Sequence, residues 1–251
     1  MRVFKRKKPD RAPFRALQQR SPGQSLRVRF FDIATNSSTG FVLVMCAAVL
    51  ALVHLLLPDL MLLAIAGMTL SGACLAIPST LAMIRLSKGV QAEAHVGQFL
   101  QTLERRGAYV LHDVCRSGFN IDHVVIAQSG VYVIETKYVS KAGRGGREVI
   151  ACRDGVLTRN GRQMRGDALG QVRRATEEVG RMTRALGYAP PLRPVLVFPG
   201  WWTQSAGPAW VLNERAVLKW IARARPVMTA DETRKLYLAL RAPAPAEAVA
   251  A

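Results

Sequence analysis

The feature that most constrains this chain is a run of apolar residues between Phe41 and Ile84. Its first part reads FVLVMCAAVLALVHLLL and its second reads LMLLAIAGMTLSGACLAIPSTLAMI, with Pro58 and Asp59 between them. A membrane-spanning helix needs about 20 apolar residues, so the run predicts two spans joined by a tight turn. A buried helical pair in a soluble core is the alternative, but a run of this length with one acid and one histidine favours the membrane.

Lysine and arginine are distributed in a way that orients the two expected spans. The 251-residue chain has a formal net charge of +18, with ten of its 35 Lys and Arg in residues 1–30 and none in residues 41–84. Arg85 and Lys88 follow the second span, and the turn between the spans carries neither residue type. Because cytoplasmic flanks are enriched in Lys and Arg, both ends should be cytoplasmic. We therefore expect a multi-pass protein of the cytoplasmic (inner) membrane, with its soluble domain in the cytoplasm.

The basic surplus also favours a polyanionic partner, either nucleic acid or the anionic face of the lipid bilayer. A solvated surface that only keeps the protein soluble is the alternative. The four cysteines include no CxxC pair, and neither they nor the four histidines have a spacing that would build a zinc site. The cysteines are expected to be reduced thiols, as in a cytosolic domain.

Composition divides the chain into five segments. Residues 1–40 form a basic cytoplasmic arm whose Pro, Gly, Ser and Gln content predicts flexibility, and residues 41–86 hold the two transmembrane helices. Residues 87–210 form the soluble domain, residues 211–241 a C-terminal helical extension, and residues 242–251 an Ala/Pro-rich disordered tail.

Hydrophobic periodicity predicts an α/β pattern in the soluble domain. Two β-rich runs, residues 121–127 and 131–137, are separated by a Gln-Ser-Gly turn and indicate a hairpin. The other expected elements are a helix over 91–105 that stops at Gly107, strands over 109–114, 148–152, 155–159 and 194–198, a helix over 167–186, and two helices within 211–240.

Three chemically useful side chains lie on the expected hairpin. A two-residue turn at 128–129 would place Asp122 directly opposite Glu135, whereas a turn at 129–130 would place Asp122 opposite Lys137. In either register the two carboxylates are neighbours within about 8 Å. Glu135 and Lys137 are two residues apart and therefore share a face of their strand.

Carboxylates that face each other on otherwise apolar strands repel unless a positive charge lies between them. Mg²⁺, or Mn²⁺ in its place, takes hard oxygen ligands from one or two carboxylates and keeps several waters. Such an ion polarises a phosphate and lowers the pKa of a bound water. Lys137 beside it could orient that water or offset charge on the phosphate. The alternative is a salt-bridged strand pair in which Lys137 neutralises Glu135.

The order and spacing of these residues resemble a known superfamily. The pattern D-x(12)-E-T-K across a hairpin, after a helix that bears Glu93, resembles the PD-(D/E)XK nucleases. More narrowly, the chain is similar to the nuclease-related domain (NERD) family over about residues 88–210, through AEAHVG at 92–97, NIDHVVI at 120–126, GVYVIETK at 130–137, ALGQVRRA at 168–175 and PVLVF at 194–198. The resemblance implies a restriction-endonuclease-like core, a mixed sheet flanked by helices, preceded by the transmembrane hairpin.

The resemblance also implies a role for each matched residue. Asp122 and Glu135 would be metal ligands, with the Thr136 carbonyl as a possible third, and Lys137 would be the catalytic lysine. Glu93 would be the accessory acid of the first helix; without the resemblance it is equally a first-turn acid stabilised by the helix dipole.

Gln171 would be the polar residue of the later helix, and a solvated surface position is the alternative for it. The family often has a proline shortly before that helix, where this chain has Gly166, Asp167 and Ala168.

A groove for nucleic acid is expected beside this site. Arginine suits phosphate contacts, which are mostly independent of base sequence. Three tryptophans, Trp201, Trp202 and Trp210, could stack on bases, although a core or membrane-interface role is the more common one for tryptophan. The expected nucleic-acid-binding residues are Lys141, Arg144, Arg147, Arg162, Arg165, Arg173 and Arg174, and Arg153 and Arg159 belong to the same basic stretch.

Three hypotheses follow for function. The first is a membrane-anchored, Mg²⁺-dependent nuclease that hydrolyses phosphodiesters of DNA or RNA. The second is a non-catalytic domain of the same fold that tethers nucleic acid or a protein partner to the membrane. The third is a scaffold whose basic face lies on lipid. The presence of Asp122, Glu135 and Lys137 together favours the first.

Overall fold

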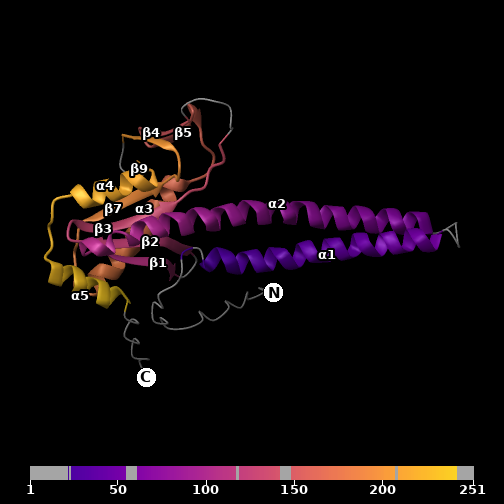
Figure 1. The fold of residues 1–251 in the computed structure, drawn as a ribbon, viewed down its shortest axis with the longest axis horizontal. Coiled ribbons are helices and arrows are strands. Elements are labelled where there is room, and N and C mark those ends of the chain that lie inside the picture. The colour runs from indigo at the N-terminus through magenta and orange to yellow at the C-terminus, as the bar shows by residue number, and fades with distance from the viewer. Residues whose placement is uncertain are drawn as a thin grey trace, which may run out of the picture.

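The computed structural model describes residues 22, 24–54, 61–116, 119–141, 148–206 and 209–241. An α/β domain lies at one end, and two long helices lie side by side and project from it as a rod (Figure 1). The mixed sheets flanked by helices confirm the predicted α/β class. The expected turn at Pro58 and Asp59 and the expected tail at 242–251 lie outside the described residues.

The two projecting helices are α1 (Gln24–His54) and α2 (Met61–Gln101). Both are long and apolar enough to cross a membrane, by length and composition. Their bounds differ from the expected ones. The helix α1 begins at Gln24, so residues 24–40, which the composition assigned to a flexible arm, are helical. The helix expected over 91–105 is the last part of α2, and no linker separates it from the apolar segment. Pro78 is accommodated inside α2.

Small residues hold α1 against α2. A side chain at Gly40 would clash with Ala76, and one at Gly72 would clash with Val44 and the Gly40 carbonyl. Ala76 itself is buried. Small residues permit this close approach, which is how helices associate where no hydrophobic effect separates them from their surroundings.

Several hydroxyl groups along this pair have hydrogen-bond partners within the pair. Ser37 and Thr80 hydrogen-bond to each other across it at 3.1 Å. Other hydroxyls donate to carbonyls one helical turn earlier, as Ser38 does to Ala34 at 2.9 Å, and Thr35, Thr39 and Thr69 follow the same pattern. Internal partners of this kind suit a surface that water does not reach.

The main sheet of the domain has the strand order β1-β2-β3-β7-β9. Strands β1 (Tyr109–Arg116), β2 (Phe119–Ala127) and β3 (Gly130–Thr136) are antiparallel, whereas β7 (Leu192–Val197) and β9 (Trp210–Leu212) continue the sheet in parallel with β3. The β2–β3 hairpin, the strand at 192–197 and a helix between them agree with the predicted pattern, and β9 was not predicted.

Helices cover both faces of this sheet. On one face, the last turns of α2 and α4 (Glu214–Arg223) bury Val96, Leu100 and Val217 against β2, β3 and β7. On the other, α3 (Ala168–Ala185) and α5 (Ala230–Arg241) pack on β1, β2 and β3. The segment expected to be a C-terminal extension therefore contributes two helices to the core of the domain.

A smaller sheet with the order β6-β5-β4-β8 packs beside the first. Its strands are β4 (Val149–Arg153), β5 (Val156–Arg159), β6 (Arg162–Gln163) and β8 (Trp202–Ser205), of which β6 and β8 were not predicted. Its inner face buries Ile150, Cys152 and Leu157 against Val172 of α3 and Phe198. Asp167 caps α3 by accepting a hydrogen bond from the Gly170 N–H at 2.9 Å. The N-terminus of α3 is therefore stabilised without the proline that is frequent in the family that the sequence resembles.

The close helix pair gives a prediction with a matched control. Gly40→Ile should force α1 away from α2, because a Cβ at this position lies 2.7 Å from the Ala76 nitrogen. Overpacking of this kind costs about 1–3 kcal/mol, so the thermal unfolding midpoint of the full chain in detergent should fall by several degrees. Gly67→Ile is the control, since a Cβ there has no atom within 4 Å. Equal midpoints for the two variants would contradict the tight packing at Gly40.

Candidate active site

Asp122 and Glu135 occupy the first of the two expected registers. The ladder between β2 and β3 pairs Ala127 with Gly130 and His123 with Ile134, so the turn is at 128–129. One step further along, Asp122 faces Glu135. The Asp122 carboxylate accepts a hydrogen bond from the Thr136 N–H at 2.7 Å, which fixes the carboxylate at the end of β3.

Lys137 contacts Glu135 directly. Its Nζ lies 2.6 Å from Glu135 Oε1, and both side chains retain some exposure. This is the ion pair of the salt-bridge interpretation, and it also places an ammonium group at the mouth of the carboxylate cluster. The main chain continues the parallel ladder here, since the Lys137 N–H donates to the Val197 carbonyl at 2.9 Å.

Glu93 joins the cluster from α2. Glu93 is only 8% exposed. Burial, followed by the charges of Asp113 and Glu135, raises the pKa of its carboxyl from the ordinary 4.5 to about 8. Burial, followed by the charges of Glu135 and Glu93, likewise raises the pKa of Asp122 well above its usual range. The expected accessory acid is therefore close enough to the two strand carboxylates to affect them.

Asp113 is an acid of this cluster that the sequence analysis missed. It is 2% exposed and has a φ of 49°, a left-handed conformation that is uncommon for a residue other than glycine. The β1–β2 ladder pairs His112 with His123 and Val114 with Ile121, but the Asp113–Asp122 pair between them is absent. Directly opposed like charges destabilise an antiparallel pair, and the turned backbone avoids this one. Asp113 raises the pKa of Glu93 instead.

Two histidines support the cluster from the α2 side of the strands. His112 and His123 are buried, and their Nδ1 atoms are 2.9 Å apart, so one ring must donate to the other. Burial lowers the pKa of both, to about 4 for His112 and about 3 for His123, where His112 adds to the effect. Both rings are therefore neutral near pH 7. His112 lies next to Gly97 of α2, so the histidine pair packs against the helix that carries Glu93.

The donor set fits a hard divalent cation. The charge of Glu135 on β3 contributes to the raised pKa of Glu93 on α2 and of Asp122 on β2, and a cation between these carboxylates would relieve the repulsion. Within the described ranges, no group of three or more His, Cys, Asp or Glu side chains has the arrangement that would hold a metal ion by itself. A cation here would therefore depend on one or two carboxylates and on water, which is the pattern typical of Mg²⁺.

A groove lined by arginine lies beside the cluster. Arg159 and Arg162 pair across β5 and β6, and together with Arg165 they line a hollow of about 450 Å³. Val139, two residues beyond Lys137, forms part of the same wall. All three arginines are exposed. Two of the expected nucleic-acid-binding residues, Arg162 and Arg165, thus share one groove next to the end of β3.

The other expected basic residues are more dispersed. Lys141 lies 5.8 Å from the ring of the buried Trp201, while Arg173 and Arg174 on α3 face acids, Glu177 at 4.0 Å and Asp167 at 2.9 Å. Gln171, in the first turns of α3, is exposed. Arg144 and Arg147 lie outside the described residues.

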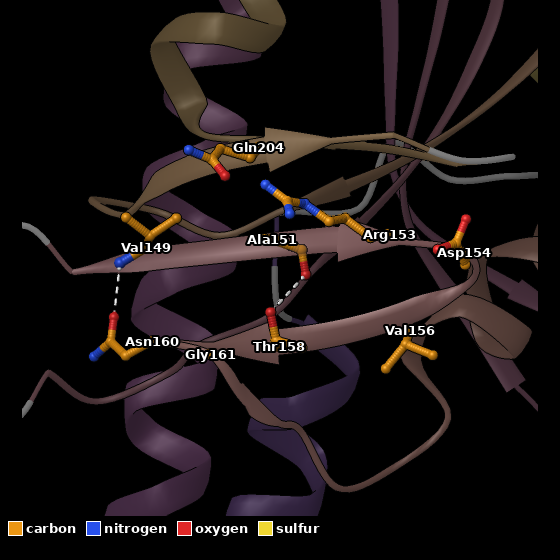
Figure 2. A pocket seen from close by; sticks show the side chains of 9 residues that line it. All are labelled: Val149, Ala151, Arg153, Asp154, Val156, Thr158, Asn160, Gly161 and Gln204. Carbon is orange, nitrogen blue, oxygen red and sulfur yellow. Dashed lines mark hydrogen bonds between the residues drawn. The ribbon is translucent and has the colours of Figure 1, made fainter.

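The outer face of the small sheet carries a second hollow, of about 730 Å³, whose side chains come from β4, β5 and β8 (Figure 2). Arg153 and Asp154 are its charged residues, with Thr158 and Gln204 beside them. One arginine balanced by one aspartate gives this face little preference for a polyanion. Arg153 is therefore separate from the arginine groove.

The expected tryptophans divide between core and surface. Trp201 is buried and donates its Nε1–H to the Val139 carbonyl at 3.0 Å. Trp202 and Trp210 are exposed, and the ring of Trp210 packs against Trp220 with 4.6 Å between centroids. Trp201 thus has the core role, whereas Trp202 and Trp210 lie at the surface.

Comparison with known families gives one match. Residues 88–199 match the family described as "Nuclease-related domain". No curated protein and no solved structure matches the chain. The matched segment begins at Lys88 in α2 and ends beyond β7, so it contains Glu93, Asp122, Glu135 and Lys137.

The raised pKa of Glu93 predicts a pH dependence of stability. Below pH 4.5 the carboxyl is protonated in the folded and the unfolded chain alike. As pH rises towards 8, the unfolded chain releases this proton while the folded chain keeps it, so the free energy of unfolding falls. Glu93→Gln should therefore lose less thermal stability than the unmodified chain between about pH 5 and pH 8 in chelator-treated buffer. Glu177→Gln, an exposed acid on α3, should follow the unmodified chain; identical pH profiles for all three proteins would contradict the burial of Glu93.

Proposed function

We propose, from the nuclease-related domain that residues 88–199 form, that this protein is a membrane-anchored, metal-dependent nuclease that hydrolyses phosphodiesters of DNA or RNA. The observation that supports this most directly is the register of the β2–β3 hairpin. It brings Asp122 and Glu135 face to face, with the Lys137 ammonium at 2.6 Å from Glu135.

Each of these side chains has a role in the proposed reaction. Asp122 and Glu135 would hold Mg²⁺ or Mn²⁺, with the Thr136 carbonyl as a further oxygen ligand. When bound, the ion would polarise the phosphate and lower the pKa of a coordinated water. The Thr136 N–H holds the Asp122 carboxylate in place, so the ligand is positioned before substrate arrives.

Lys137 would act on the phosphate or on the attacking water. Its ammonium group donates hydrogen bonds and offsets the negative charge that develops on the phosphate oxygens as the water oxygen bonds to phosphorus and the bond from phosphorus to the leaving oxygen breaks. Glu93 closes the cluster from α2, and a bound cation would favour its ionised form by offsetting the neighbouring carboxylates. Gln171, near the start of α3, would be a polar contact for substrate.

The membrane part of the proposal depends on α1 and α2, whose length and apolar composition suit two spans. The exposed large apolar side chains on these helices, such as Phe41, Leu52 and Leu70, would face lipid. The excess of Lys and Arg before and after the spans supports a topology with both ends in the cytoplasm. In this arrangement the domain lies at the inner surface of the cytoplasmic membrane.

A second candidate function is a non-catalytic domain that binds nucleic acid or a protein partner at the membrane. One observation favours it: Lys137 already neutralises Glu135. Such a domain would bind nucleic acid in a salt-sensitive way, without cleavage and without a requirement for Mg²⁺.

The catalytic proposal predicts the effect of removing each group. Full-length protein should cleave nucleic acid only with Mg²⁺ or Mn²⁺, and Glu135→Ala or Lys137→Ala should reduce the rate at least about 100-fold, because each removes charge stabilisation at the reacting phosphate. The measurement is cleavage of single-stranded DNA, double-stranded DNA and RNA across a metal titration.

Glu177→Ala and Lys235→Ala are the matched controls for this experiment, since both residues are exposed on helices of the domain. They should cleave like the unmodified chain. Salt-sensitive binding without cleavage by any of the proteins would support the second candidate function, and undiminished cleavage by Glu135→Ala would contradict the proposed mechanism.

The arginine groove predicts the salt dependence of binding. Replacing Arg159, Arg162 and Arg165 by Gln should weaken binding of all nucleic acids alike. It should also lower the magnitude of the slope of log affinity against log salt by about 2 to 3, because each lost phosphate contact removes roughly 0.7–0.9 from that slope. Fluorescence anisotropy at several salt concentrations measures this slope. The control triple variant replaces Arg215, Arg223 and Arg225, which are exposed near α4; an equal change in both slopes would show that only net charge matters.

A further inference from the structure

Four basic residues lie at one level of the α1–α2 rod. Contacts between the two helices align Gly40 with Ala76 and Leu26 with Gly89, so residues 27–29 of α1 lie beside residues 85–89 of α2. All four side chains are exposed. We call this set the basic collar: Arg27, Arg29, Arg85 and Lys88.

The collar lies where the exposed apolar surface of the rod ends. On α2 this surface ends at Ile84; on α1 it runs from Leu52 to Phe41, and the exposed Phe31 lies beyond the more polar stretch 32–40. Arg29 and Arg85 are the next basic residues on each helix. The stretch from Phe31 to Leu52 measures about 32 Å along a helix axis, close to the roughly 30 Å of a bilayer's hydrocarbon core.

The collar charges are available to an external anion. Among the acids whose side chains the structure describes, none forms an ion pair with any of the four. Lys88 is 5.8 Å from the ring centroid of Tyr138, a residue that is 45% exposed and directly follows Lys137. Tyrosine beside lysine or arginine at the end of an apolar helix is typical of the membrane interface.

We propose that the basic collar binds the phosphate groups of anionic phospholipids in the cytoplasmic leaflet, with Tyr138 at the same level. The proposal rests on the membrane anchoring proposed above, but not on catalysis. Guanidinium groups bind phosphate oxygens in pairs, and four cations at one level of a two-helix rod attract anionic lipid from several sides. The bound lipid would fix the depth of the rod in the bilayer and hold the end of β3 at the headgroups.

The position of the collar favours lipid over nucleic acid as its occupant. Nucleic acid would have to lie against the apolar surface that begins next to Arg29 and Arg85, whereas a phospholipid presents its phosphate to the collar and its acyl chains to that surface. A phospholipid therefore complements both the basic collar and the apolar surface beside it.

The test compares two matched quadruple variants of the full-length protein in detergent. One replaces Arg27, Arg29, Arg85 and Lys88 by Gln, and the control replaces Arg215, Lys219, Arg223 and Arg225, which are exposed at or next to α4. Phosphatidylglycerol or zwitterionic phosphatidylcholine is titrated in, and retained lipid is quantified by mass spectrometry together with the thermal unfolding midpoint.

The unmodified chain and the control variant should retain phosphatidylglycerol in preference to phosphatidylcholine and should unfold at a higher temperature in its presence. Each collar charge contributes about a fivefold change in lipid affinity, so the collar variant should bind phosphatidylglycerol at least about 100-fold more weakly. Its unfolding midpoint without lipid should match the control, which shows that it folds.

Three outcomes would overturn the proposal: equal retention of the two lipids by the unmodified chain, equal loss in both variants, or a loss of nucleic-acid binding by the collar variant with lipid binding unchanged. Glu135→Ala should retain the lipid, so failure of the nuclease function is distinguishable. Extraction of the unmodified protein from membranes by alkaline carbonate would show instead that the anchoring itself is wrong.

Discussion

The continuity of α2 is the constraint on which the rest of the structure depends. This one helix runs from the apolar rod into the core of the domain. There it buries Val96 and Leu100 against the main sheet and presents Glu93 to the strand carboxylates. A helix rises about 1.5 Å per residue, so Lys88 of the collar and Glu93 of the cluster are separated by only about 8 Å along the axis. The position of the site relative to the rod is therefore set by a rigid element and not by a linker.

The cluster is held together against its own charge. Burial and the neighbouring carboxylates raise the pKa of Asp122 and of Glu93, so it is costly to ionise both beside Glu135. Three features offset this: the Thr136 N–H bond to Asp122, the Lys137 ammonium, and the left-handed turn at Asp113 that avoids an Asp–Asp pair. A fold rarely retains such a costly arrangement without use for it, because replacing the acids by apolar residues would commonly stabilise the chain. The cost is the physical argument for a cation and substrate at this position.

Much of this site could be predicted from the sequence, because the position and length of a hairpin turn fix which residues of the two strands lie opposite each other. A two-residue turn at 128–129 is sufficient to place Asp122 opposite Glu135. The same reasoning predicts a place for Asp113 near Asp122, since a two-residue turn at the Ser-Gly dipeptide of positions 117–118 would set the two residues opposite each other in the sequence register. Periodicity could not show that α2 is unbroken, because the change from apolar to amphipathic surface at Arg85 resembles a boundary although the backbone continues. The short strands β6, β8 and β9 depend on pairing with distant segments, which no local pattern records.

The two basic surfaces lie at different places around the cluster, and this bears on how a substrate would reach it. The collar is on the rod and borders an apolar surface, so it suits phosphates that belong to lipid. The arginine groove is on β5, β6 and the segment that follows, away from the rod, and it shares Val139 with the end of β3. A phosphodiester chain that follows the groove would arrive at Lys137 from the small sheet and leave along the membrane surface. Lipid bound at the collar would limit its path there, because two polyanions repel at short range. Under the proposed function, a substrate that enters by an end or lies parallel to the bilayer would therefore fit this arrangement better than one that has to cross the collar.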